Sequence, residues 1–210
     1  MSDNNLTQPA IGILGLLPSL AIATTLVKGL SIGVIVALVL LGTSFICSLF
    51  RRRIAESWRI PFLLTVSALL TTLLQMNLAA FLFSVYAALG LFVPLVAVNG
   101  LIFTRSLSMA FQRPVLATLW DAFVIGVGVA AVLTLLGALR ELVAYGSLFL
   151  GAEMLFGPQA KVLLWHPLPK NYSFILAGMA PGALILLGIL YGLKNLIWRG
   201  SQAEMPTQPR

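Results

Sequence analysis

The sequence predicts an all-α polytopic membrane protein with six transmembrane segments arranged as two inverted three-helix repeats. Three observations lead to this fold class. Of the 210 residues, 60% are hydrophobic and only 9% are charged, whereas a soluble domain typically carries about 25% charged residues. The mean hydropathy is +1.02. The apolar residues form six runs, each near the ~20 residues that a bilayer-spanning helix needs, and one sequence pattern occurs twice.

The six apolar segments have similar lengths but differ in regularity. The first contains Gly12, Gly15 and Pro18 and is the least regular span. The connection 140–171 contains apolar pieces too short to span, so we expect it to lie on the membrane surface or to dip into the membrane. The segments cover residues 10–27, 30–50, 60–82, 85–104, 115–139 and 172–193. We therefore expect a tail at 1–9, one membrane domain at 10–199 and a polar tail at 200–210.

The repeated pattern pairs the second segment with the fifth. Residues 32–42 read IGVIVALVLLG, and residues 125–137 read IGVGVAAVLTLLG. Each copy follows a stretch in which LGL is closely followed by proline. Two copies of a three-helix unit, about 10–82 and 85–199, would insert in opposite directions because each has an odd number of spans. Chance similarity between helices rich in Leu, Val and Gly is the alternative.

A proline interrupts the apolar run in each half of the chain. Pro18 lies in LGLLPSL and Pro94 in LGLFVPL. Proline removes a backbone donor and crowds the preceding turn, so we expect a break or kink at both places. In lipid, a freed backbone group is tolerated only beside protein or a water-filled cavity. Paired interruptions of this kind mark the working centre of many membrane proteins, and Asn99 could satisfy the groups freed near Pro94.

The net charge of +7 indicates topology, because the basic residues lie at the ends of apolar runs and not on one face. This placement argues against nucleic acid as a partner. With a cytoplasmic N-terminus, nine basic residues are inside (Arg51, Arg52, Arg53, Arg59, Arg105, Arg113, Lys194, Arg199 and Arg210) and four outside (Lys28, Arg140, Lys161 and Lys170). This excess predicts that both termini are cytoplasmic. The single cysteine, Cys47, excludes an intrachain disulfide and a cysteine metal cage built by this chain alone.

Charged residues within the apolar segments are few. Asp121 could belong to an ion or proton path, or it could pair with Arg105 or Arg113 near the interface. Arg140 and Glu141 end the fifth segment, where they could form an interfacial ion pair, cap a helix or contact a partner subunit. The sequence contains no nucleophile–base pair, phosphate-binding loop or redox motif, so we assign no catalytic residue and no metal ligand.

Several motifs, in this order, resemble the RnfE/NqrD family, and RnfE most closely. This family supplies membrane subunits to the Rnf (ferredoxin:NAD) and Nqr (NADH:quinone) ion-pumping electron-transfer complexes. The matching stretches run through nearly the whole chain: LGLLPSLAIATT at 14–25, RIP at 59–61, Gln75, LGLFVPL with Asn99 at 89–99, Arg105, IGVG at 125–128, LGALRELVAYGSLF at 136–149 and APGAL at 180–184.

The resemblance implies a specific fold, partner and cofactor. The first and fourth helices would be broken into half-helices, and an RnfA-like sister subunit would complete a pseudo-symmetric core in a bacterial inner membrane. Each of the two subunits in such a pair gives two cysteines to one shared [2Fe–2S] cluster. Leu17 and Gly100 occupy those positions here, and neither can ligate iron by its side chain. A variant complex without this cluster, unusual ligands from the partner, and substituted cysteines are the alternatives.

The resemblance therefore predicts a subunit of an ion-translocating electron transport complex that moves Na⁺ or H⁺. Flavins and iron–sulfur clusters would belong to partner subunits of the B, C, D and G types. A stand-alone inverted-repeat transporter of a small solute is the alternative function. The candidate centre comprises the residues of the two interruptions, Gly15, Leu17, Pro18, Pro94, Asn99 and Gly100, with Asp121 as a candidate for the ion path.

Overall fold

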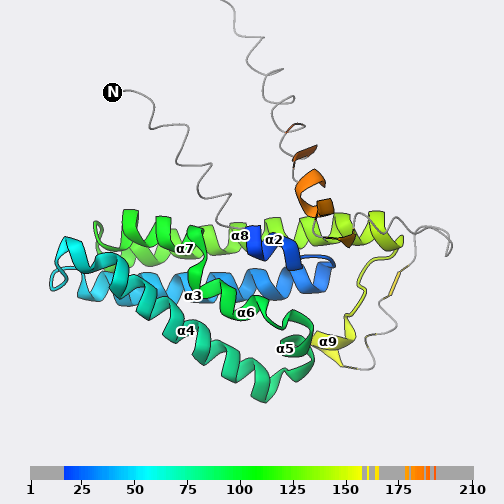
Figure 1. Cartoon of the computed structure of the whole chain (residues 1–210), viewed down its shortest axis with the longest axis horizontal. Coiled ribbons are helices and arrows are strands. Elements are labelled where there is room, and N and C mark those ends of the chain that lie inside the picture. Colours follow the sequence, from blue (N-terminus) through cyan, green and yellow to red (C-terminus); the bar gives the residue numbers. More distant parts are fainter. Residues whose placement is uncertain are drawn as a thin grey trace, which may run out of the picture.

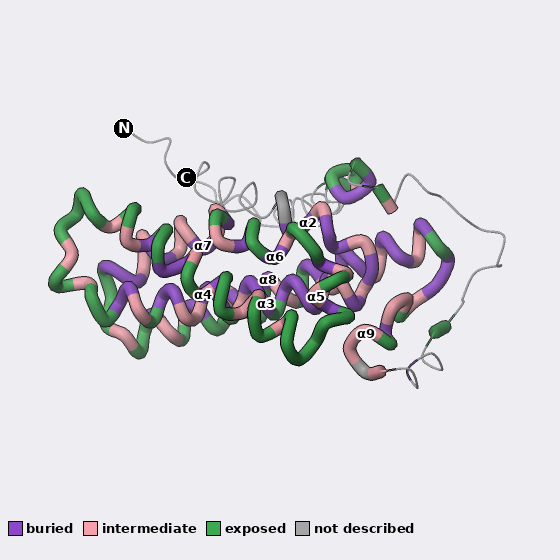
Figure 2. The backbone as a smooth tube through the Cα atoms, turned by 60° about the horizontal axis from the view of Figure 1, so that its bottom comes forward, coloured by how far each residue is buried: buried purple, intermediate pink, exposed green. Residues whose placement is uncertain are grey.

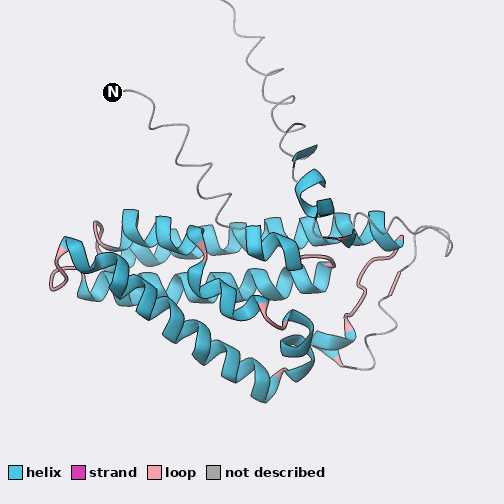
Figure 3. Cartoon of the chain, in the orientation of Figure 1, coloured by secondary structure: helices cyan, strands magenta, loops and turns pink. Residues whose placement is uncertain are grey.

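The computed structural model describes residues 17–157, 160, 164–165, 178–179, 181–186, 188–189 and 192. Among these residues the secondary structure is helical, apart from one isolated antiparallel bridge between Leu148 and Trp165 (Figure 3). Four described stretches are long and apolar enough to cross a membrane: Leu26–Phe50, Glu56–Phe81, Phe92–Ala110 and Val115–Tyr145. The prediction of a mostly helical chain with several membrane-length apolar helices is thus confirmed for these residues. Both tails, Gly12, Gly15 and most of segment 172–193 lie outside the described residues.

Two long helices, α3 (Leu26–Phe50) and α8 (Val115–Tyr145), form the centre of the described structure and lie side by side (Figure 1). Thr25 caps the N-terminus of α3, since its hydroxyl oxygen accepts the N–H of Lys28 at 3.3 Å. Gly146 ends α8 in a left-handed conformation, with φ of 61°, which glycine adopts without steric cost.

Glycines allow α3 and α8 to approach each other closely. A Cβ on Gly33 would meet the backbone of Ala130 at 2.6 Å, and a Cβ on Gly126 would meet the side chain of Ala37 at 2.9 Å. Later residues of α3 face earlier residues of α8, so the two helices run antiparallel. Small residues at such a contact let helix backbones pack tightly inside a membrane, where apolar burial alone gives little driving force.

The remaining described elements lie around this pair (Figure 1). The short helix α2 (Leu17–Ile22) lies against α8, and α4 (Arg59–Phe81) starts beside α3 and diverges from it (Figure 1). A 3-10 turn, η1 (Glu56–Trp58), precedes α4, and α9 (Glu153–Phe156) lies beside α5 (Phe83–Leu89). Buried residues gather where α3 and α8 face each other, while α4 is largely exposed (Figure 2). Much of that exposed surface is apolar, as a lipid-facing surface requires.

The fourth predicted segment, 85–104, does not form one helix. Helix α5 ends at Gly90, and the chain continues through α6 (Phe92–Leu95), the 3-10 turn η2 (Val96–Val98), α7 (Gly100–Arg105) and the π-helix η3 (Ser106–Ala110). The span-length stretch is therefore 92–110, later in the chain than expected. Gly90 causes this shift, because its φ of 50° ends α5 and lets the chain start again.

Helix α8 is longer than the predicted segment 115–139. It continues to Tyr145, so Arg140 and Glu141 lie inside the helix and not at its end. Both side chains are fully buried, with 0% exposure. A buried charge in a helix is tolerated only when hydrogen bonds satisfy it, and most of the bonds to these two side chains come from residues far away in the sequence. The predicted helix end at residue 139 was therefore wrong, because the partners that allow Arg140 and Glu141 to be buried are not visible in the local sequence.

Candidate functional site

Within the span-length stretch 92–110, the helix is interrupted at Asn99 and not at Pro94. Asn99 has an extended backbone (φ −68°, ψ 121°) between η2 and α7, whereas Pro94 lies inside the single turn of α6. A proline in the first turn of a helix costs little, because the N–H that it lacks would have no partner within the helix. Gly100, which follows the break, begins α7.

Asn99 connects the stretch around Pro94 to the stretch around Pro18. It is 1% exposed, and its side-chain oxygen accepts the N–H of Leu101 at 3.0 Å, which caps α7. Its amide nitrogen lies 3.2 Å from the hydroxyl oxygen of Ser19 in α2. Helices α2 and α6 are also in contact. The stretches that contain Pro18 and Pro94 therefore meet in space.

A neighbouring hydroxyl satisfies the backbone near the break. The hydroxyl of Ser67 on α4 donates to the carbonyl oxygen of Ala97 in η2 at 2.8 Å. Ser67 is 0% exposed, so this bond forms away from solvent. An irregular backbone at membrane depth needs such partners because lipid offers none.

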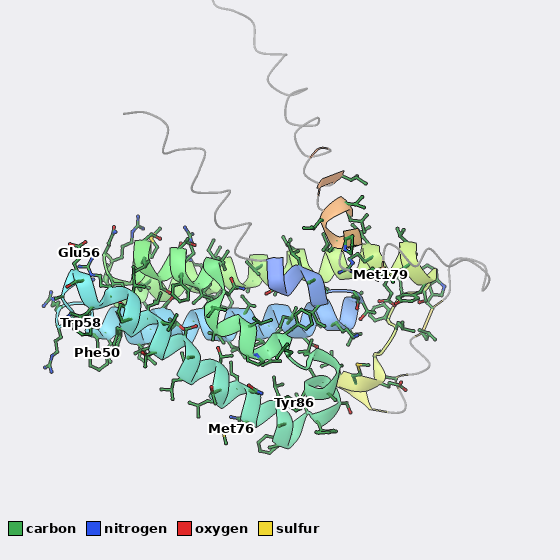
Figure 4. The ribbon with its side chains drawn as sticks, in the orientation of Figure 1. Phe50, Glu56, Trp58, Met76, Tyr86 and Met179 are labelled. Atoms are coloured by element: carbon green, nitrogen blue, oxygen red, sulfur yellow. The ribbon has the colours of Figure 1, made fainter. Side chains whose placement is uncertain are left out.

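The buried Arg140 holds the C-terminal end of α2. One terminal nitrogen, Nη1, donates to the carbonyl oxygens of Leu20 at 3.0 Å and Ala23 at 2.9 Å, with Ala21 at 3.4 Å. The last carbonyls of a helix have no partner within the helix, and a cation is favourable beside them. The other nitrogen, Nη2, donates to the carbonyl oxygens of Gly178 at 3.1 Å and Met179 at 2.9 Å. Met179 is labelled above α8 in Figure 4.

Glu141 holds the start of α3, on the other side of the connection between α2 and α3. Its Oε2 accepts the backbone N–H of Leu26, the first residue of α3, at 2.9 Å. Its Oε1 accepts the N–H of Leu150 at 2.5 Å. A carboxylate at the first turn of a helix satisfies a free N–H and is favoured by the helix dipole. Arg140 and Glu141 together therefore clamp residues 20–26, the stretch in which α2 ends and α3 begins.

Asp121 forms an ion pair away from this clamp. Its Oδ1 lies 2.9 Å from Nη2 of Arg105, and the two side chains are 24% and 32% exposed, respectively. This is one of the two arginine partners that the sequence suggested. Arg105 lies at the end of α7, directly before the π-helix. The candidate ion-path residue is thus tied to α7, the helix that begins directly after Asn99.

The described residues do not fit the ligands of an iron–sulfur cluster. They contain no group of three or more His, Cys, Asp or Glu side chains that could hold a metal ion. Cys47 is buried with Leu63, Ala110 and Phe111 in a separate apolar cluster. Gly100 has no side chain, and thiolate or imidazole is the ligand such a cluster requires.

The predicted site residues thus occupy different positions relative to the breaks in the helices. Asn99 lies at the break, Pro94 and Gly100 lie in the helices on either side of it, and Leu17 and Pro18 begin α2. Gly15 lies outside the described residues. The sequence prediction did not assign Ser19, Arg140 and Glu141 to this centre. A signal was present for the last two, since the apolar pattern continues past them through Leu142–Tyr145.

Comparison with known proteins gives matches along nearly the whole chain. Residues 2–191 match the family model described as "Rnf-Nqr subunit, membrane protein". The chain is 40% identical over 191 residues to the E subunit of the ion-translocating oxidoreductase complex of Haemophilus influenzae (strain PittGG), covering 90% of this chain and 82% of that protein. It is 39% identical over 199 residues to the protein of the same name from Shewanella oneidensis (93% and 86% covered). The value for Vibrio atlanticus is 36% over 200 residues (95% and 87% covered).

Proposed function

Because this chain belongs to the Rnf-Nqr family of membrane subunits, we propose that it serves as the E subunit of an ion-translocating oxidoreductase complex. The observation that carries this function is the similarity to proteins of that name over more than nine-tenths of the chain. The chain would form the membrane core of the complex with an RnfA-like sister subunit. Electron transfer would then depend on flavins and iron–sulfur clusters in the partner subunits.

An inverted-repeat core is part of this proposal. The contacts between α3 and α8 support it, because Gly33 faces Ala130 while Gly126 faces Ala37. In the repeated pattern, Gly33 corresponds to Gly126 and Ala37 corresponds to Ala130. Exchanging the two copies therefore exchanges one contact for the other. A two-fold relation between oppositely inserted units produces this arrangement.

The stretches around Pro18 and Asn99, with the connection at residues 23–25 between α2 and α3, would form the moving centre of the subunit. The hydrogen bond between Asn99 and Ser19 and the clamp made by Arg140 and Glu141 support this assignment. Half-helices whose ends are held by side chains can rearrange as units when those bonds change. Passage of Na⁺ or H⁺ would accompany such a rearrangement, with the pair of Arg105 and Asp121 at one end of it.

This chain would not ligate a [2Fe–2S] cluster, and no electron would pass through its side chains. Iron analysis and EPR spectroscopy of the purified complex test this point. We expect no cluster signal that depends on cysteines of the sister subunit facing this chain. A well-populated [2Fe–2S] signal that disappears when those cysteines are replaced would contradict the proposal.

The function itself is tested by isolating the chain with its natural partners. An affinity-tagged chain, expressed at its native level and extracted in a mild detergent, should retain a stoichiometric set of redox subunits, identified by mass spectrometry. A tagged membrane protein of unrelated function from the same cells is the control for non-specific retention. Recovery of the chain as a lone homo-oligomer would instead favour the stand-alone transporter.

A further inference from the structure

A groove lies beside the turn that connects α3 to α4. Its volume is about 430 Å³, and its lining includes Arg53, Ile54, Trp58, Pro61, Phe62 and Thr65. The lining is mostly apolar, and Arg53 is its charged residue. Phe50 packs against Phe62, with ring centroids 5.9 Å apart. Figure 4 shows Phe50, Glu56 and Trp58 together at this end of the molecule.

Three arginines at this turn have no partner in the described part of the chain. Arg51, Arg52 and Arg53 are partly or fully exposed, and the ion pairs among the described residues involve other side chains. Arg59, by contrast, bonds to Glu56 at 3.3 Å and lies over the ring of Phe111 at 5.4 Å from its centroid. The only carboxylate of the turn, Glu56, is therefore already engaged, and the turn keeps a strong positive charge.

The position of the groove matches the boundary between lipid tails and headgroups. Phe50 ends one candidate span, and the next begins at Glu56. Trp58 is 68% exposed, and indole rings favour the headgroup level of a bilayer. Pro61, Phe62 and Thr65 line the groove from α4, and Arg53 lines it from the turn.

We propose that this groove binds an anionic phospholipid, with the phosphate against Arg52 and Arg53 and the start of an acyl chain along Phe62 and Thr65. Basic pockets at the ends of membrane helices recognise acidic lipid headgroups in this way. A free phosphate ion would use the arginines but would gain nothing from the apolar wall. A basic turn that served topology alone would need no groove beside it. The site is independent of the redox function proposed above.

The test measures which lipid lies next to Trp58. The sample is the full chain, purified with its natural partners. Trp120, Trp165 and Trp198 are replaced by phenylalanine, so that Trp58 is the only tryptophan of this chain. Its signal is separated from tryptophans of the partners by using tryptophan-free partner subunits or by labelling Trp58 with fluorine. The protein is reconstituted into nanodiscs that contain brominated phosphatidylglycerol or brominated phosphatidylcholine in equal amounts. We expect stronger quenching by phosphatidylglycerol, and about fivefold weaker preference for each arginine removed in R52Q and R53Q.

Arg113→Gln is the matched control, because Arg113 is exposed before α8 and does not line the groove. This variant should keep the full preference for phosphatidylglycerol. Equal quenching by the two lipids, or an equal loss in R113Q, would overturn the proposal. Loss of the preference on adding millimolar inorganic phosphate would indicate a phosphate site, and absence of quenching by either lipid would indicate a partner subunit over the groove. Both outcomes also overturn the lipid site.

Discussion

At the scale of single residues, the stretch between α2 and α3 is stabilised by Arg140 and Glu141, whose side chains bond to backbone groups and not to each other. Arg140 donates to carbonyls of α2 and of residues 178–179, and Glu141 accepts from the N–H groups of Leu26 and Leu150. A backbone group in lipid has no water to replace such a partner. Two adjacent charged residues can thus be buried without forming an ion pair with each other.

Replacing Arg140 should strongly destabilise the protein. Arg140→Gln cannot reach the same set of carbonyls, and each stranded buried carbonyl costs on the order of 1–3 kcal/mol. Chemical denaturation in detergent micelles, followed by circular dichroism, measures the loss. Arg113→Gln, at an exposed position, should change the free energy of unfolding by less than about 0.5 kcal/mol. Similar small changes in the two variants would show that Arg140 does not hold the break.

The bond between Asn99 and Ser19 predicts energetic coupling between residues that are far apart in sequence. Asn99→Ala should cost more than Ser19→Ala, because it also removes the cap on α7. A double-mutant cycle should give a coupling energy of about 0.5–1.5 kcal/mol. Ser19→Ala combined with Asn77→Ala is the control, since Asn77 is exposed and bonds only to its own helix in the described structure. Additive effects in both cycles would contradict the proposed link.

At the scale of elements, the contact between α3 and α8 depends on glycines at particular positions. Gly126 faces Ala37 closely, whereas a Cβ on Gly128 would meet no described atom within 4 Å. Gly126→Ala should therefore cost about 1–3 kcal/mol through overpacking, and Gly128→Ala should be neutral or slightly stabilising. Unfolding in detergent measures both variants. Equal tolerance of the two substitutions would mean that the helices can separate at little cost.

The sequence predicts elements well where the apolar pattern is continuous. The boundaries of α4 agree with the predicted segment 60–82 to within one residue. The end of α8 was missed because Arg140 and Glu141 resemble a helix terminus until their partners in α2, α3 and residues 150 and 178–179 are known. Within residues 89–100, a break was expected at Pro94, whereas the helices are interrupted at Gly90 and at Asn99. The bond between Asn99 and Ser19 joins residues far apart in the sequence, so no local pattern predicts it.

At the scale of the whole molecule, positive charge is concentrated at one end of the described helices. The turn with Arg51, Arg52 and Arg53 and the connection with Arg113 both lie at the same end of the α3 and α8 pair (Figure 1). Glu141 brings Leu150 to the start of α3, which places residues 147–150 at the opposite end. Since positive residues favour the cytoplasmic side, we expect the arginine-rich end to face the cytoplasm of a bacterial inner membrane.

Cysteine labelling on intact spheroplasts tests this orientation, because the only native cysteine, Cys47, is buried and can first be replaced by alanine. Ser57→Cys, in the exposed turn η1, should react with a membrane-impermeant maleimide only after permeabilisation. Phe149→Cys, at the other end, should react in intact spheroplasts. Gln112→Cys is the control, since it lies near Arg113 and should behave like Ser57→Cys. Labelling of the two arginine-end cysteines from outside, with Phe149→Cys protected, would mean that charge does not set the topology of this protein.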